Sequence, residues 1–161
     1  MKAKKMAKKS SANDVVELIL RDHKPLKKLI KSLKSEDITI ARKRPLFAEF
    51  ASLLAAHAKP EEKSLYVHMK EEDKLRTDAF EGDTEHAIAD QLIAEIKMAN
   101  DEDKWMAKVK VLAELVEHHI EEEEEDMLPR VKKEIVAEMR EEIGEEYLRL
   151  RGEFMEEEEA A

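Results

Sequence analysis

Cysteine is absent from this chain of 161 residues, which excludes disulfide bonds, thiolate zinc sites and iron–sulfur clusters. Any metal must therefore be bound through nitrogen and oxygen atoms. Glycine (three residues), proline (four) and aromatic side chains (4%) are also scarce, so the chain has little of what a β-sheet needs. Ala, Leu, Glu and Lys, which are strong helix formers, dominate instead. These features predict an all-α protein, and the 42% of apolar residues are enough for one core.

Long apolar runs are missing as well. No run approaches the roughly 18 residues that a membrane-spanning helix needs, and the basic beginning of the chain lacks the apolar segment of a secretory signal. The expected compartment is therefore the cytoplasm. Residues 1–12 carry five lysines and no acidic residue, whereas the remaining chain has 24 basic and 39 acidic residues. Because so acidic a body repels phosphates, neither nucleic acid nor a membrane is expected as a partner, and residues 1–12 are interpreted as a disordered basic tail.

The sequence contains an internal repeat built from histidine and glutamate. In each copy a histidine stands four residues before a glutamate, and 34 or 33 residues further upstream stands a histidine that directly follows an acidic residue. On an α-helix the four-residue spacing places both side chains on one face, so that they can share a metal ion. The repeat thus predicts a duplicated helix pair with metal-ligating side chains: His23, His57 and Glu61 in the first copy, and His86, His119 and Glu123 in the second.

The apolar periodicity predicts four helices, each with its candidate ligands on the apolar face. They are expected from Asn13 or Asp14 to about residue 35, from residues 41–45 past Val67, from just after Gly82 to about residue 100, and from about residue 101 through the acidic run. Short connections within each pair favour an up-down-up-down antiparallel four-helix bundle over residues 13–130. Residues 131–161 are expected to form an extra C-terminal amphipathic helix, broken near Gly144, and an acidic tail.

Other interpretations of these residues differ in what they explain. A single histidine on a core face is usually hydrogen-bonded rather than metal-bound, but buried glutamates need cations because an unpaired buried carboxylate costs several kcal/mol. Glu123 lies in a run of five glutamates, so its assignment depends on the repeat. The same repeat favours His119 over His118 as a ligand and leaves His68 out. Ferritin-like sites need Glu-x-x-His pairs and zinc hydrolases a compact His-Glu-x-x-His motif, and the sequence has neither.

These motifs together resemble the hemerythrin-like, HHE cation-binding family. The resemblance implies a four-helix bundle that holds two iron ions joined by an oxo or hydroxo group. It also implies that His23 and His57 bind one iron, that His86 and His119 bind the other, and that Glu61 and Glu123 bridge the two. Iron is inferred from the family, because the affinity order of divalent ions at nitrogen and oxygen donors does not select it.

Two positions depart from the pattern of the oxygen-carrying members. Where those have a further histidine, four residues beyond His86, this chain has Asp90, which is either a weak oxygen ligand or a solvated residue. Their second bridge lies five residues beyond the histidine of the fourth helix, where this chain has Glu124, with Glu123 at the four-residue spacing. With fewer protein ligands, both irons keep exchangeable positions. We therefore expect a di-iron oxidoreductase or sensor that reacts with peroxide, O2 or NO. The alternative is reversible O2 or iron binding without turnover.

Overall fold

The computed structural model describes residues 11–161, and this part of the chain consists of helices and short connections, without strands. Residues 1–10, which contain the basic residues of the expected tail, lie outside the described part. The elements in chain order are α1 (Val15–Lys34), α2 (Ile40–Lys63), α3 (Leu65–Met69), α4 (Arg76–Met98), α5 (Glu102–Glu122), the π-helical turn η1 (Glu123–Met127), α6 (Leu128–Glu134) and α7 (Ala137–Ala160).

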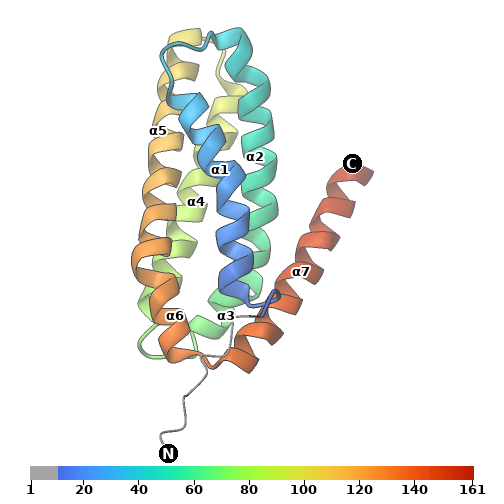
Figure 1. Cartoon of the computed structure of the whole chain (residues 1–161). Coiled ribbons are helices and arrows are strands. Elements are labelled where there is room, and N and C mark those ends of the chain that lie inside the picture. The colour runs from blue at the N-terminus through green and yellow to red at the C-terminus, as the bar shows by residue number, and fades with distance from the viewer. Residues whose placement is uncertain (1–10) are drawn as a thin grey trace, which may run out of the picture.

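The long helices α1, α2, α4 and α5 stand side by side as an antiparallel bundle (Figure 1). Short loops join α1 to α2 and α4 to α5 at one end, and α3 connects the two hairpins at the other. Three of these helices are capped by a side chain that accepts a hydrogen bond from a backbone N–H group in the first turn: Asp14 for α1, Thr39 for α2 and Asp101 for α5. The predicted all-α, up-down-up-down four-helix bundle with an extra C-terminal helix is thereby confirmed.

Three boundaries differ from the prediction. Helix α4 begins at Arg76, about seven residues early, because Gly82 is a buried helical residue rather than the end of a loop. The second helix ends at Lys63, and α3 follows after Ser64. The prediction of a helix break near Gly144 was wrong, since α7 runs unbroken to Ala160 and includes the expected acidic tail. The helical structure is interrupted earlier, at residues 135–136 between α6 and α7.

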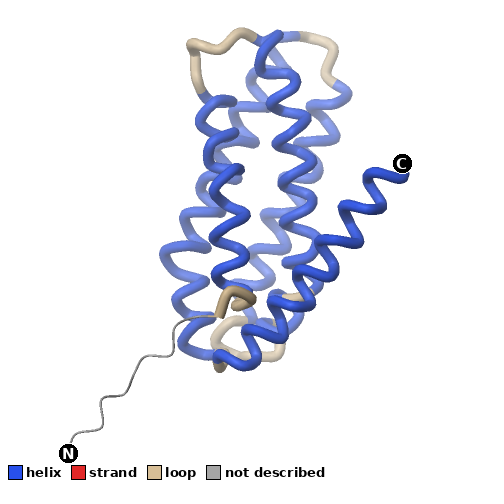
Figure 2. The backbone as a smooth tube through the Cα atoms, turned by 45° about the vertical axis from the view of Figure 1, so that its right-hand side comes forward, coloured by secondary structure: helices blue, strands red, loops and turns tan. Residues whose placement is uncertain are grey.

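Helix α7 packs against α1 and α2 at an angle to the bundle (Figure 2). Its Gly144 lies so close to the start of α1 that an added Cβ would be 1.6 Å from the backbone oxygen of Asn13. Arg140 donates from Nε to Oδ2 of the capping Asp14 at 2.8 Å. A glycine contact and a largely buried ion pair therefore fix α7 to the beginning of the bundle.

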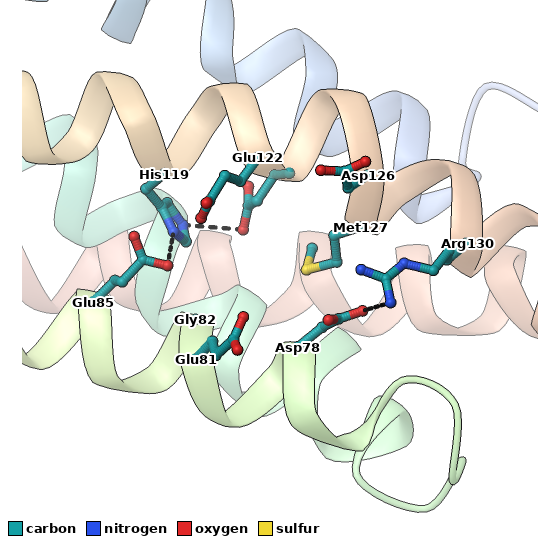
Figure 3. Close-up of a pocket in the computed structure, with 10 residues that line it drawn as sticks. Asp78, Glu81, Gly82, Glu85, His119, Glu122, Asp126, Met127 and Arg130 are labelled. Carbon is teal, nitrogen blue, oxygen red and sulfur yellow. Dashed lines mark ion pairs between the residues drawn. The ribbon is translucent and has the colours of Figure 1, made fainter.

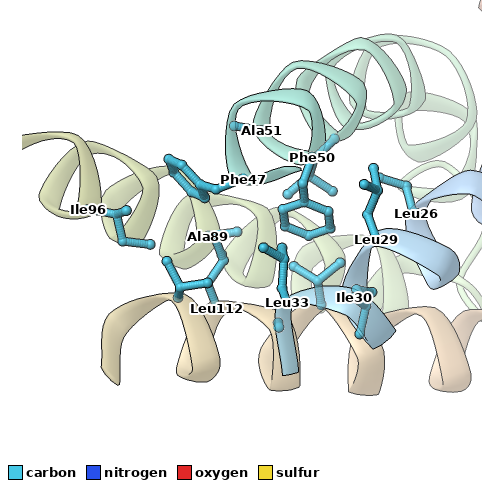
Figure 4. Close-up of a cluster of buried hydrophobic side chains, with 14 of the residues drawn as sticks. Leu26, Leu29, Ile30, Leu33, Phe47, Phe50, Ala51, Ala89, Ile96 and Leu112 are labelled. Carbon is cyan, nitrogen blue, oxygen red and sulfur yellow. The ribbon is translucent and has the colours of Figure 1, made fainter. Parts of the chain in front are cut away.

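The apolar core has two parts, with the candidate ligands between them. One cluster fills the end of the bundle near the short loops, around Phe47, Phe50 and Leu112 (Figure 4). The other joins α3, α6 and α7 to the beginning of α1 and includes Tyr66 and Tyr147. On α1 and α4 the histidine falls, in sequence, between members of the two clusters, and after the histidines of α2 and α5 the second cluster continues in α3 and η1. The polar layer is thus enclosed by apolar packing on both sides.

None of the helices in the described part of the chain is long and apolar enough to cross a membrane.

Candidate metal centre

The structure brings all six predicted ligands together in the bundle interior. Helix α1 provides His23, α2 provides His57 and Glu61, α4 provides His86 and α5 provides His119, while Glu123 is the first residue of η1. All six are buried, with between 0% and 6% of their surface exposed. Their donor atoms form two groups that could each hold a metal ion, namely His23, His57 and Glu123, and Glu61, His86, His119 and Glu123.

The two carboxylates each span both histidine pairs. Glu123 places Oε2 3.0 Å from Nε2 of His23 and Oε1 3.0 Å from Nε2 of His119. Glu61 places Oε2 3.4 Å from Nε2 of His57 and Oε1 3.5 Å from Nε2 of His86. In both carboxylates one oxygen therefore faces the pair from α1 and α2, and the other faces the pair from α4 and α5.

Several of these converging atoms have no hydrogen-bond partner although they are fully buried. They are Nε2 of His23, Nε2 of His57, both carboxylate oxygens of Glu61 and Oε2 of Glu123. Buried polar atoms are normally satisfied, because each one left without a partner costs roughly 1–3 kcal/mol. A cation between them would satisfy imidazole nitrogens and carboxylate oxygens at once. The donor set therefore fits a metal ion bound through nitrogen and oxygen.

The pKa values of the two carboxyl groups shift in opposite directions. Burial, followed by the negative charge of Glu123, raises the pKa of Glu61 well above its ordinary value. Burial acts on Glu123 too, but the adjacent His119 and His23 outweigh it and hold the pKa of Glu123 well below its ordinary value. Burial also opposes a charge on His119, yet Glu123 and Glu85 raise the pKa of that imidazole. Within this pair, Glu61 therefore favours its protonated form and Glu123 its ionised form.

The outer nitrogen, Nδ1, of each histidine faces a group that can orient the ring. Such a contact fixes the tautomer, so that Nε2 presents its lone pair to a metal. The contacts to Nδ1 are Glu124 Oε1 at 3.0 Å for His23, the Tyr147 hydroxyl at 2.9 Å for His57, Glu62 Oε1 at 3.5 Å for His86 and Glu85 Oε1 at 3.3 Å for His119.

These contacts explain why an acidic residue precedes the first histidine of each copy of the repeat. Glu85, which precedes His86, turns to His119 on the neighbouring helix. Asp22 occupies the corresponding place in the first copy and lies 3.7 Å from Nδ1 of His57. Because both copies use the acid in the same way, the repeat covers the groups that orient the ligands as well as the ligands themselves.

Two tyrosines that the sequence analysis did not single out complete the site. The hydroxyl of Tyr66 on α3 donates to Oε1 of Glu123 at 2.7 Å, and its ring stacks on His86 with a centroid distance of 5.5 Å. A Cβ on Gly82 would lie 2.4 Å from that hydroxyl, so only glycine leaves room for it. Burial, followed by the charges of Glu123 and Glu61, raises the pKa of Tyr66 well above its ordinary value, which keeps the phenol protonated as a donor.

Tyr147 reaches the centre from α7, outside the four-helix bundle. Its hydroxyl donates to Oδ2 of Asp22, and Nε of Arg151 donates to the same oxygen at 3.1 Å. Since burial and the charge of Asp22 raise the pKa of Tyr147, it too stays protonated. Tyr66 could have been found from its place nine residues beyond His57, but no local signal marks Tyr147, which depends on how α7 docks.

The two further candidates, Asp90 and Glu124, lie outside the converging set. Asp90 is exposed and pairs with Lys59 Nζ at 2.6 Å, so of its two interpretations the solvated one describes it. Glu124 contacts the outer nitrogen of His23 and Nζ of Lys27. His118 is two-thirds exposed.

The π-helical turn accounts for the different directions of Glu123 and Glu124. It begins at Glu123, directly after α5, and extends to Met127. Such turns insert a residue into a helix and are frequent at functional sites. Here Glu123 is buried against the histidines, while Glu124 is partly exposed beside α1. The carboxylate that faces the centre is therefore the one at the four-residue spacing from His119.

Fold and site together define a helical-bundle protein with a buried metal centre made of histidine and glutamate. Residues 14–131 match the family described as the hemerythrin HHE cation binding domain. The chain belongs to this family, as its motifs indicated, and it is a hemerythrin-like metal-binding protein. Searches of curated proteins and of solved structures gave no match.

Proposed function

We propose that the centre binds two iron ions and reacts with a small oxygen or nitrogen species, namely peroxide, O2 or NO. His23 and His57 would hold one ion, and His86 and His119 the other, with Glu61 and Glu123 shared between them. The observation that carries this proposal is the orientation of the two carboxylates, each of which turns its two oxygens towards different histidine pairs. A single-ion site would need only one oxygen of each.

The number of donors supports reactivity. Two imidazole nitrogens and two carboxylate oxygens per ion are four protein donors, which leaves positions for exchangeable ligands, as in other histidine–carboxylate iron sites. Bound iron would supply electron exchange between its ferrous and ferric states.

The protein's part is to orient the donors and to limit access to them. The groups at Nδ1 of His23, His57 and His119 favour the tautomer that presents Nε2 inwards, and carboxylates in this position make the ligand more basic. Tyr66 holds a proton on its hydroxyl, 2.7 Å from Oε1 of Glu123, which makes it the nearest proton donor to that carboxylate. Two apolar clusters enclose this layer. The arrangement favours small reactants over large ones.

The proposal is tested with protein loaded anaerobically with Fe2+, whose visible spectrum is recorded before and after peroxide is added. A band typical of paired ferric ions, together with peroxide consumption beyond two equivalents, is the expected result. Replacing Glu123 by Gln should abolish the paired-iron spectrum, and replacing the exposed Glu121 by Gln should leave it intact. Two bound irons that bind O2 reversibly without consuming peroxide would instead establish the alternative, a binding or sensing protein. Loss of the spectrum in both variants would refute the assignment of the bridge.

A further inference from the structure

A small acidic cavity lies between α4 and the segment formed by α5, η1 and α6. Its volume is about 100 Å3, enough for about three water molecules at ~30 Å3 each. Asp78, Glu81 and Glu85 line it from α4, and Glu122 and Asp126 line it from the opposite side (Figure 3). Glu81, Glu122 and Asp126 are exposed at the surface, so the cavity begins at solvent.

The inner wall of this cavity is part of the metal centre. His119 and Glu123 both line it, and both side chains are buried, with only 7% and 2% of their surface exposed. The cavity therefore leads from exposed carboxylates to two buried side chains of the candidate centre. It reaches the centre at His119, a member of the histidine pair from α4 and α5.

The internal repeat shows that two of the three acidic residues on α4 are specific to the second copy, whereas Glu85 corresponds to the acidic Asp22. A shift of 63 residues, which relates His86 to His23, relates Asp78 to Val15 and Glu81 to Leu18. Val15 and Leu18 are buried in the apolar cluster to which α7 contributes Tyr147. At the positions of Asp78 and Glu81 the second half of the bundle is therefore acidic and open. The corresponding positions in the first half are apolar and covered by α7.

We propose that this cavity is the route by which a divalent metal cation reaches the centre, arriving first on the side of His86 and His119. This inference rests on the proposed function, since it presumes a centre that takes up metal. The physical reason is electrostatic: a narrow opening with low-dielectric walls and charges of one sign concentrates the opposite ion and speeds its association. The same lining disfavours small anions.

A cationic side chain, that of Arg130, already lines this cavity. Nη1 of Arg130 lies 3.1 Å from Oδ2 of Asp78, an oxygen that is buried and accepts no well-aligned hydrogen bond. Half of the Arg130 side chain is exposed, so the guanidinium can leave into solvent. An incoming cation would take its place at Asp78 before moving on to Glu123.

The route is tested by the rate at which the metal-free protein takes up Co2+, whose absorption reports its coordination, in stopped-flow mixing at low salt. Replacing Glu81 by Gln together with Asp126 by Asn should slow uptake about threefold to tenfold, within the range of electrostatic effects on association. The final cobalt content should stay the same, since neither side chain belongs to the centre. At about 0.5 M salt the difference should shrink, because screening then acts within a few ångströms.

A matched control removes the same charge elsewhere. Glu121 and Glu125 are exposed on the same segment of the chain and line the surface groove beside α1 instead. Replacing both by Gln should leave the uptake rate within about twofold of the unsubstituted protein, since their charges lie outside the proposed route. Equal slowing in both double variants would show a general effect of net charge and overturn the route, as would unchanged rates in both. If the unsubstituted protein takes up no cobalt at all, the proposed function itself fails.

Discussion

Replacing Glu61 by Gln should have opposite effects on the stability of the metal-free and the metal-loaded protein. In the metal-free protein both oxygens of Glu61 are buried without hydrogen-bond partners, and the donor oxygens of Glu61 and Glu123 lie within 4.8 Å of each other. The amide keeps the shape of the side chain, removes an ionisable group from the interior and offers a donor to Glu123. In the metal-loaded protein the same change removes a shared anionic ligand.

The magnitude follows from the cost of burying polar groups without partners, roughly 1–3 kcal/mol each. A gain of about 2 kcal/mol in the free energy of unfolding corresponds to about 4–8 °C in Tm for a protein of this size. Thermal unfolding followed by circular dichroism, with chelator and with bound metal, measures both effects. We expect Glu61→Gln to raise the Tm of the metal-free protein and to reduce the increase in Tm that metal produces.

The matched control is Glu49→Gln, an exposed position on the same helix, which should change neither value by more than about 1–2 °C, as is usual for surface substitutions. If Glu61→Gln lowered the Tm of the metal-free protein and left the metal-induced increase unchanged, Glu61 would be a structural residue and the reasoning would be refuted.

Three further predictions concern pH, packing and the orientation of one ligand. Because the folded state raises the pKa of Glu61, the metal-free protein binds more protons folded than unfolded above the ordinary carboxyl value of 4.5, so its stability should fall as pH rises through the raised pKa. The advantage of Glu61→Gln in chemical unfolding should accordingly grow with pH, and a constant advantage would contradict this. Gly144→Ala should lower the free energy of unfolding by about 1–3 kcal/mol in urea titrations, because the added methyl group overpacks against the backbone before α1. Gly152→Ala, whose added methyl group meets no other atoms, should raise it by up to about 1 kcal/mol. Stabilisation by both substitutions would disprove the close docking of α7. Tyr147→Phe removes the hydroxyl beside His57 and should weaken metal binding about 10- to 100-fold in competition with a chelator, while an unchanged affinity would exclude an orienting role.

The sequence predicted the bundle and the convergence of its ligand candidates because both depend on local periodicity and on the internal repeat. Two of the errors in helix boundaries share one cause. Gly82 and Gly144 were interpreted as a helix start and a break, but both are inside helices, where the missing Cβ allows the ring of Tyr66 or the backbone at Asn13 to approach. A sequence alone does not separate a glycine that ends a helix from one that permits close packing.

The part of the site that could not be predicted comes from tertiary docking. Tyr147 is 90 residues from His57 in the chain, and its contact exists only because α7 folds back over α1 and α2. The acidic cavity likewise joins residues of α4 to residues of η1 and α6. In contrast, the direction of Glu123 followed from the repeat even though η1 departs from α-helical geometry.

The proposed di-iron centre is best tested by the metal content per chain, measured by elemental analysis after growth in iron-rich medium. We expect two iron ions per chain, one for each group of converging donors. Most of the metal should be lost in His57→Ala and in His119→Ala, and none in His68→Ala, since His68 lies on α3 outside the centre. Equal losses in all three variants, or an unsubstituted protein that binds no metal, would contradict it.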